Sequence, residues 1–316
     1  MSSFGKLEII HPYISSKPPT AVSKGICKTM ETNGNLKTNQ KRVVLKIVLE
    51  VGFYVILATF SYLLSFNKIA YFHPFRRGFF CQNQDLMYPY GEVSVKGGHV
   101  ALISLLPLII IISITECLRI RHKIKKKVFL RKWYRIVGPL LLGLTLCTLF
   151  YETAKSCVGS LRPHFFAVCR PSIDLKNCTS KYTYITDYNC TEPENDLLID
   201  SRKSFPSGHA SISWYGMTFL IIYIHLRISR RWRFLRPLFA LLQTVALCVA
   251  TYIGVTRIQD NAHRPVDIIA GAVIGISFAV ITVSQTSALF ESDSTDRQSS
   301  TAKEDKRESL TLEYEP

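Results

Sequence analysis

The stretch "SFPSGHASIS", residues 204–213, places a histidine, His209, at the entrance of a long apolar run. The run extends over 210–227, and about 20 apolar residues are enough for a helix to cross the hydrocarbon core of a bilayer. Proline, serine and glycine form a polar turn directly before the histidine. Whatever chemistry His209 performs, we therefore expect it to take place near a membrane surface.

Apolar runs of this length recur along the chain of 316 residues, and they lie at 47–66, 99–118, 136–153, 210–227, 237–254 and 266–286. The two ends of the chain are polar and lack such runs. We therefore predict an all-α integral membrane protein with six transmembrane helices. Its expected parts are a cytoplasmic N-terminal tail at 1–42, a membrane domain at 43–287 and an acidic cytoplasmic C-terminal tail at 288–316, with both tails disordered.

The formal net charge of +16 is concentrated beside the apolar runs. Nine Lys or Arg and no acid lie in 119–135, and five arginines lie in 227–236. Basic residues beside membrane spans mark the cytoplasmic side and contact anionic lipid head groups. No nucleic-acid recognition motif accompanies the charge, so we expect the bilayer as a partner and no nucleic acid.

This charge pattern places three loops outside the cell or in a lumen: 67–98, 154–209 and 255–265. Two N-glycosylation sequons, at Asn177 and Asn189, fall in the longest of these loops. The same compartment favours disulfides among the four loop cysteines, Cys81, Cys169, Cys178 and Cys190. Four cysteines allow three pairings, and the sequence leaves all three open.

Three polar segments stand at membrane edges on that outer side: "KSCVGSLRP" at 155–163, "KSFPSGHAS" at 203–211 and "TRIQDNAHRPVD" at 256–267. Their cations Lys155, Arg162 and Arg257 would supply positive charge, and arginine presents planar forks that suit phosphate oxygens. Ser207 and Gly208 precede a helix, where a hydroxyl and free N–H groups can bind an anion. These features together imply a phosphate ligand.

Two histidines in these segments, His209 and His263, remain for chemistry, because imidazole transfers protons or attacks as a nucleophile near neutral pH. Asp267 follows His263 by four residues, and Pro265 fits the first turn of a helix between them. That spacing puts the carboxylate on the same helix face as the imidazole. We expect Asp267 to bind one ring nitrogen of His263 and so direct the other at the substrate.

The three segments resemble the three signature motifs of the type 2 phosphatidic acid phosphatase (PAP2) superfamily. Further stretches resemble its lipid phosphate phosphatase branch, whose members have six spans: "FRRGFFC" at 75–81, "YPY" at 88–90 and "SLRPHF" at 160–165. The similarity covers most of 45–286, whereas the tails match nothing in the family. The resemblance implies a helical bundle with the PAP2 fold.

Carried over to this chain, the resemblance implies that five residues hold the phosphate: Lys155, Arg162, Ser207, Gly208 and Arg257. It implies that His263 attacks phosphorus to form a phosphohistidine, that Asp267 orients His263, and that His209 protonates the leaving alkoxide. No metal and no cofactor is required in this family, because cationic side chains and N–H groups can stabilise the transition-state oxygens.

Two departures from the family pattern concern the third motif. Thr256 stands where the family usually has serine, and it keeps the hydroxyl. Arg264 and Pro265 follow the proposed nucleophile, and Arg264 adds positive charge beside it. These changes bear on substrate preference more than on activity.

The leading function is a phosphatase for lipid phosphomonoesters such as phosphatidate, lysophosphatidate, sphingosine 1-phosphate or ceramide 1-phosphate. The alternatives are a catalytically weak adaptor-like relative and a phosphatase for a soluble phosphate ester. Lys155, His209 and His263 are intact, which disfavours the adaptor. We favour the plasma membrane, and the sequence leaves open an internal membrane and a homo-oligomer.

Overall fold

The computed structural model describes residues 45, 47–65, 73–119, 126–173, 180, 182–228, 232–286 and 289. The chain divides into two compact units, Met1–Phe53 and Tyr54–Pro316. The predicted N-terminal tail, nearly all of the predicted C-terminal tail, Asn177 and Cys178 fall outside the described residues. The described part of the first unit is the beginning of a helix that runs over Ile47–Ser65.

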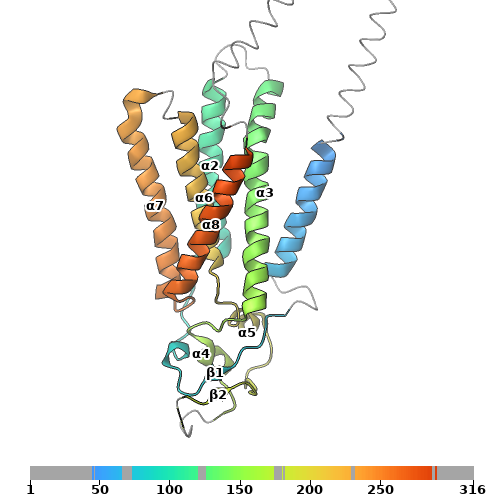
Figure 1. Ribbon diagram of the computed structural model, residues 1–316, viewed down its shortest axis with the longest axis vertical. Helices are drawn as coiled ribbons and strands as arrows, with labels where there is room; N and C mark the ends of the chain where they lie inside the picture. The colour runs from blue at the N-terminus through green and yellow to red at the C-terminus, as the bar shows by residue number, and fades with distance from the viewer. Residues whose placement is uncertain are drawn as a thin grey trace, which may run out of the picture. The chain divides into compact units, whose positions relative to one another are not determined.

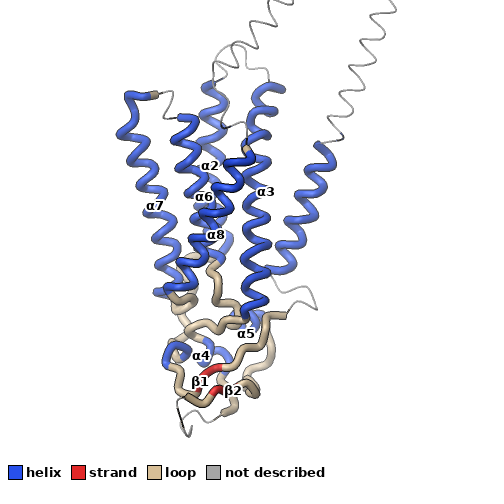
Figure 2. Tube along the Cα trace, in the orientation of Figure 1, coloured by secondary structure: helices blue, strands red, loops and turns tan. Residues whose placement is uncertain are grey.

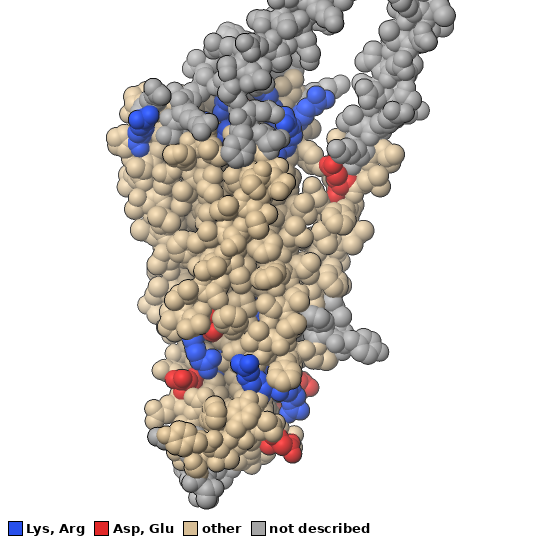
Figure 3. All heavy atoms as spheres, in the orientation of Figure 1, with Lys and Arg blue, Asp and Glu red and all other residues tan. Residues whose placement is uncertain are grey.

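Among the described residues, five helices are long and apolar enough to cross a membrane. They are Ile47–Ser65, α2 (Gly97–Arg119), α3 (Lys126–Val158), α7 (Arg236–Gln259) and α8 (Pro265–Gln285). In the view of Figure 3, charged side chains of the second unit gather toward the two ends of its helices and leave a largely uncharged middle. The predicted helical membrane fold is confirmed: the chain is an integral membrane protein.

The predicted span at 210–227 differs from the other five. Its α-helix, α6, covers only the 16 residues Gly208–Tyr223 and continues as a five-residue π-helical segment, η3 (Ile224–Ile228). Arg227 of this segment turns inward to a fully buried carboxylate, Glu116 of α2, with Nη2 3.1 Å from Oε1. The wider final turn accompanies this buried ion pair, so the span is not one regular α-helix as predicted.

Within the second unit, α6 is the central helix and contacts α2, α3, α7 and α8 (Figure 1). Its closest neighbour is α8, and Gly271 makes the approach possible. A Cβ atom at Gly271 would lie 2.4 Å from the carbonyl oxygen of Ser207, a contact that no side chain tolerates. The packing therefore brings the start of α8 directly against the start of α6.

Short elements gather at one end of the helices in the second unit (Figures 1 and 2). They are β1 (Phe79–Phe80), η1 (Gln84–Leu86), α4 (Phe165–Cys169), β2 (Tyr184–Ile185) and α5 (Asp196–Asp200). The strands β1 and β2 pair antiparallel. Phe79, Phe165 and Tyr188 are buried together in a small aromatic core beneath them.

One of the open disulfide pairings is resolved in this region. Cys169 and Cys190 form a disulfide that closes a loop of 21 residues. Cys81 is disulfide-bonded as well. The expectation that these loop cysteines form disulfides is therefore met for all three that the structure describes.

Candidate active site

The three polar segments meet where α3, α6 and α8 come together. Lys155 lies in the last turn of α3, His209 in the first turn of α6 and Arg257 in the last turn of α7. His263 lies in the connection to α8, and Asp267 lies in the first turn of that helix. The helix ends therefore gather predicted site residues that are more than 100 positions apart in sequence.

Lys155 is held in place on three sides. Its Nζ lies 2.9 Å from Oε1 of Glu152 and 5.0 Å from the ring centroid of Tyr151. A Cβ atom at Gly208 would lie 3.2 Å from the same nitrogen and 2.7 Å from the Tyr151 ring. Glycine at 208 thus lets the ammonium group lie against the start of α6.

The start of α6 presents backbone donors next to this ammonium group. Ser207 is the N-cap residue, and its hydroxyl accepts a hydrogen bond from the N–H of Ala210. The first N–H groups of a helix have no acceptor within the helix, so those of Gly208 and His209 can bind an anion. The Ser207 N–H donates to the carbonyl oxygen of Asp267 at 3.0 Å, which ties α6 to α8.

Arg257 and His209 share one acceptor that the sequence did not point to. Nη1 of Arg257 lies 3.3 Å from the carbonyl oxygen of Val95, and Nε2 of His209 lies 3.0 Å from it. The same two nitrogens lie 3.2 Å apart. Nη2 of Arg257 pairs with Asp260, which also accepts a hydrogen bond from the Ser94 N–H at 3.0 Å. The loop before α2 therefore forms one wall of the site.

His263 and Asp267 lie on the same side of the chain, as their spacing predicts, but they are not hydrogen-bonded. Nδ1 of His263 is 3.8 Å from Oδ2 of Asp267, and it is buried without a hydrogen-bond partner. Oδ2 instead accepts from the Ser204 hydroxyl at 2.6 Å and from the Arg264 N–H at 2.9 Å. These two donors hold the carboxylate away from the imidazole, which corrects the expected contact.

His263 is 3% exposed, and this burial controls its charge. Burial lowers the pKa of His263 to about 4; Asp267 opposes the shift, while the charges of Arg162 and Lys155 add to it. The imidazole is therefore neutral at pH 7. A neutral imidazole has a free lone pair and can act as a nucleophile.

Arg162 is oriented by α5. Its Nε donates to the carbonyl oxygen of Asp200 and its Nη2 to the Asp200 carboxylate, both at 2.9 Å. Burial alone would raise the pKa of Asp200, but electrostatic interactions with Arg162, Lys155, His263 and Lys203 together outweigh that effect, so the pKa is lowered overall. Asp200 thus remains a carboxylate and fixes the plane of the guanidinium.

The sequence did not predict the residues whose hydrogen bonds and ion pairs fix the predicted site residues in place. They are Ser94, Val95, Glu152, Asp200, Lys203, Ser204 and Asp260. Two of them carry a readable signal. Glu152 precedes Lys155 by three residues and Asp260 follows Arg257 by three, which is the spacing of neighbours on a helix. The others lie on α5 and on loops, far in sequence from the residues that they contact.

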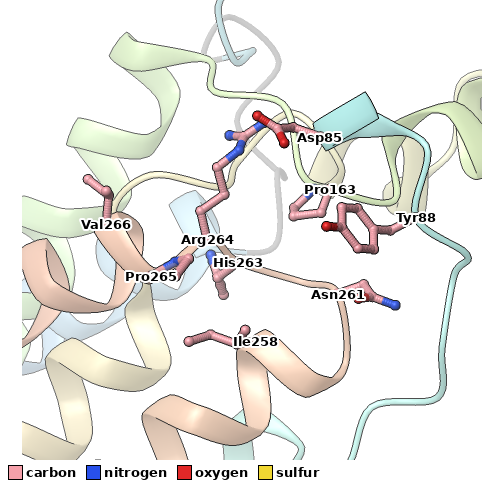
Figure 4. A pocket seen from close by; sticks show the side chains of 9 residues that line it. All are labelled: Asp85, Tyr88, Pro163, Ile258, Asn261, His263, Arg264, Pro265 and Val266. Carbon is pink, nitrogen blue, oxygen red and sulfur yellow. The ribbon is translucent and has the colours of Figure 1, made fainter. Parts of the chain in front are cut away.

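His263 opens onto a pocket of about 380 Å³. Figure 4 shows Arg264 pointing toward Asp85 at one side of the pocket and Tyr88 beside Pro163. Apolar side chains from the ends of α7 and α8 line the other side: Ile258, Pro265 and Val266. The pocket therefore joins the buried imidazole to a region with both polar and apolar walls.

Loop 88–90 is fastened to this pocket. The Tyr88 N–H donates to the carbonyl oxygen of Pro163 at 3.2 Å, and the Asn261 amide donates to that of Pro89 at 3.2 Å. The Tyr90 ring packs edge-on against His164, with 5.1 Å between centroids. The "YPY" stretch thus borders the pocket.

The chain is similar in sequence to known proteins. Residues 136–291 match the model of the PAP2 superfamily. Phospholipid phosphatase 1 of Mus musculus is 32% identical over 225 residues, which cover 69% of this chain and 77% of the relative. The putative phosphatidate phosphatase of Drosophila melanogaster is 30% identical over 290 residues, covering 84% and 73%. Phospholipid phosphatase 2 of Bos taurus is 31% identical over 224 residues, covering 69% and 76%.

A solved structure is also similar, the transmembrane PAP2 type phosphatidylglycerolphosphate phosphatase from Bacillus subtilis. It is 16% identical, with a TM-score of 0.36 over 75% of this chain and 94% of that chain. The family assignment rests on the sequence matches.

Proposed function

Because the chain belongs to the PAP2 superfamily, we propose that it is a lipid phosphate phosphatase with its active site at the extracytoplasmic membrane surface. Its substrates are lipid phosphomonoesters such as phosphatidate, lysophosphatidate, sphingosine 1-phosphate and ceramide 1-phosphate. The observation that carries the proposal is the meeting of Lys155, His209 and Arg257 beside the free N–H groups at the start of α6, with the His263 N–H hydrogen-bonded to the Arg257 carbonyl oxygen. A phosphate seated there lies among cations and donors.

The proposed reaction has two displacements at phosphorus. In the first, the lone pair of His263 forms an N–P bond while the bond from phosphorus to the lipid oxygen breaks. His209 takes up a proton as the negatively charged phosphate binds beside it. It gives that proton to the lipid oxygen, and the lipid leaves as an alcohol. In the second, water attacks the phosphohistidine, neutral His209 takes a proton from the water, and inorganic phosphate leaves with His263 restored.

The phosphate-binding groups act mainly in the transition state of each displacement. Lys155, Arg162 and Arg257 supply fixed positive charge, and the N–H groups of Gly208 and His209 supply donors to the equatorial oxygens. These groups are already oriented by Glu152, Asp200 and Asp260, so little reorganisation is needed. Asp267 keeps negative charge near His263, which favours the imidazole as it becomes positive on attack.

Phosphate release from a panel of lipid phosphates in detergent micelles with EDTA tests the proposed function. We expect turnover of the lipids in EDTA and inhibition by vanadate, which mimics five-coordinate phosphorus. No turnover of any lipid would favour the adaptor, and preference for a water-soluble ester would favour a soluble substrate. Loss of activity in EDTA that Mg²⁺ restores would contradict the metal-independent mechanism.

The proposed orientation places loop 154–209 outside the cell, at the plasma membrane, or in a lumen if the protein resides in an internal membrane. Glycosidase treatment should then increase gel mobility, and Asn177→Gln with Asn189→Gln should abolish the shift. Each single substitution is the matched control and should remove part of the shift. A tag inserted at 121–127 that antibodies reach on intact cells would contradict this orientation.

A further inference from the structure

A second lysine, Lys203, is buried beside the phosphate-binding lysine. It is 2% exposed, and it directly precedes the Ser204–Ser213 stretch. Its Nζ lies 3.7 Å from Oε2 of Glu152, whereas the Nζ of Lys155 lies 2.9 Å from Oε1 of the same carboxylate. One carboxylate therefore bridges two ammonium groups.

The contact of Glu152 with both lysines sets the net positive charge that is available to bind a phosphate. The side chains of Glu152 and Lys155 are only 7% and 9% exposed, so solvent screens their charges weakly. Paired alone, Glu152 would cancel the charge of Lys155. With Lys203 present, two positive charges and one negative charge leave the cluster with a net charge of +1.

Lys203 is fixed by contacts on more than one element. Its Nζ also donates to the carbonyl oxygen of Leu64 at 3.4 Å. The next residue, Ser204, donates its N–H to the Ser160 carbonyl oxygen at 2.9 Å and its hydroxyl to Asp267. Burial lowers the pKa of Lys203, and Glu152 opposes that shift. The two residues 203–204 thus connect all three signature segments.

We propose that Glu152 and Lys203 are positioning residues for Lys155. Glu152 holds the Lys155 ammonium group against Gly208, and Lys203 offsets the charge of Glu152 so that the cluster still attracts a phosphate. Neither residue touches the substrate in this arrangement. The assignment rests on the proposed phosphatase function.

The test compares Lys203→Met, Lys203→Arg, Glu152→Gln and the double variant Glu152→Gln/Lys203→Met. The matched control is Lys132→Met, the same substitution at a lysine of α3 that lies about 35 Å from Lys155 along that helix. Two properties are measured: kcat and KM on a lipid phosphate and a nitrophenyl phosphate, and the vanadate-induced rise in Tm. The second does not require turnover.

For Lys203→Met we expect kcat/KM to fall roughly 10- to 100-fold, mainly through kcat and equally for both substrates, because Lys155 stabilises the phosphate in the transition state and does not act on the leaving group. The vanadate shift in Tm should shrink in parallel. Lys203→Arg should restore most of both properties, since it keeps the charge. Lys132→Met should match the wild type.

The double variant separates charge compensation from a structural role. In the double variant the cluster of residues 152, 155 and 203 has a net charge of +1, as in the wild type. In Lys203→Met alone its net charge is zero. The double variant should therefore bind vanadate better than Lys203→Met. Additive losses would overturn the proposal, as would a folded Lys203→Met that matches Lys132→Met. A wild type that binds vanadate but hydrolyses nothing refutes the proposed function, and the Tm shifts then decide the inference by themselves.

Discussion

His263→Ala is expected to abolish turnover of lipid phosphates and of nitrophenyl phosphate alike, by at least about 10⁴-fold, the order of loss seen when a nucleophile is removed. The reason is covalent: alanine has no atom that can form the N–P bond. Acid-labile phosphate trapped on the protein after a rapid quench should disappear in the variant. Trapped phosphoenzyme in His263→Ala would show that another residue is the nucleophile.

The charge of His263 adds a pH signature to this result. The neutral form attacks, and burial lowers the pKa of His263 to about 4. Activity that depends on the free enzyme should therefore persist as pH falls through 6 and be lost only as the imidazole protonates near 4. Asp267→Asn is the matched control, because it keeps the imidazole and should retain part of the activity.

His209→Ala is expected to reduce activity much more on a lipid phosphate than on nitrophenyl phosphate. A lipid alkoxide is a poor leaving group that needs a proton, so the loss should be about 10²- to 10⁴-fold on a lipid phosphate. A nitrophenolate departs unprotonated, so the loss on nitrophenyl phosphate should be much smaller. Parallel initial rates on the two substrates for wild type and variant give the comparison.

The contact between His209 and Arg257 supplies the competing explanation. Their nitrogens lie 3.2 Å apart, so removing the imidazole could act through the guanidinium. In that case the enzyme would bind the phosphate group less well, and activity on both substrates would fall equally. Equal losses would therefore make His209 a phosphate-binding residue. His99→Ala is the control, since His99 lies exposed in α2 and has no part in the proposed site.

The parts of the fold that depend on local pattern could be predicted from the sequence. The apolar runs locate the membrane helices, and the Ser207–Gly208 pair locates the start of α6. The end of that span was less predictable, because its π-helical turn accompanies a pair between Arg227 and Glu116, 111 residues apart. No local pattern reveals such a partner.

The site shows the same division between local and distant partners. The spacing of His263 and Asp267 predicts that they are neighbours, and they are. It does not predict that Ser204, from another segment, takes the carboxylate oxygen. The contacts of Asp200 and Val95 could not be predicted from the sequence for the same reason, because they depend on how separate segments pack at the helix ends. Sequence motifs thus identified the candidate catalytic residues but not the residues that orient their side chains.

The position of the pocket has a consequence for how the protein would meet a lipid. Its apolar wall is formed at the ends of two membrane helices, and Val266 there is 65% exposed. A lipid can keep its acyl chains beside that wall while its head group reaches His263. The search for substrate is then two-dimensional. The reaction rate would follow the mole fraction of the lipid in the membrane, and diluting the same lipid with inert phospholipid would slow the enzyme even at constant bulk concentration.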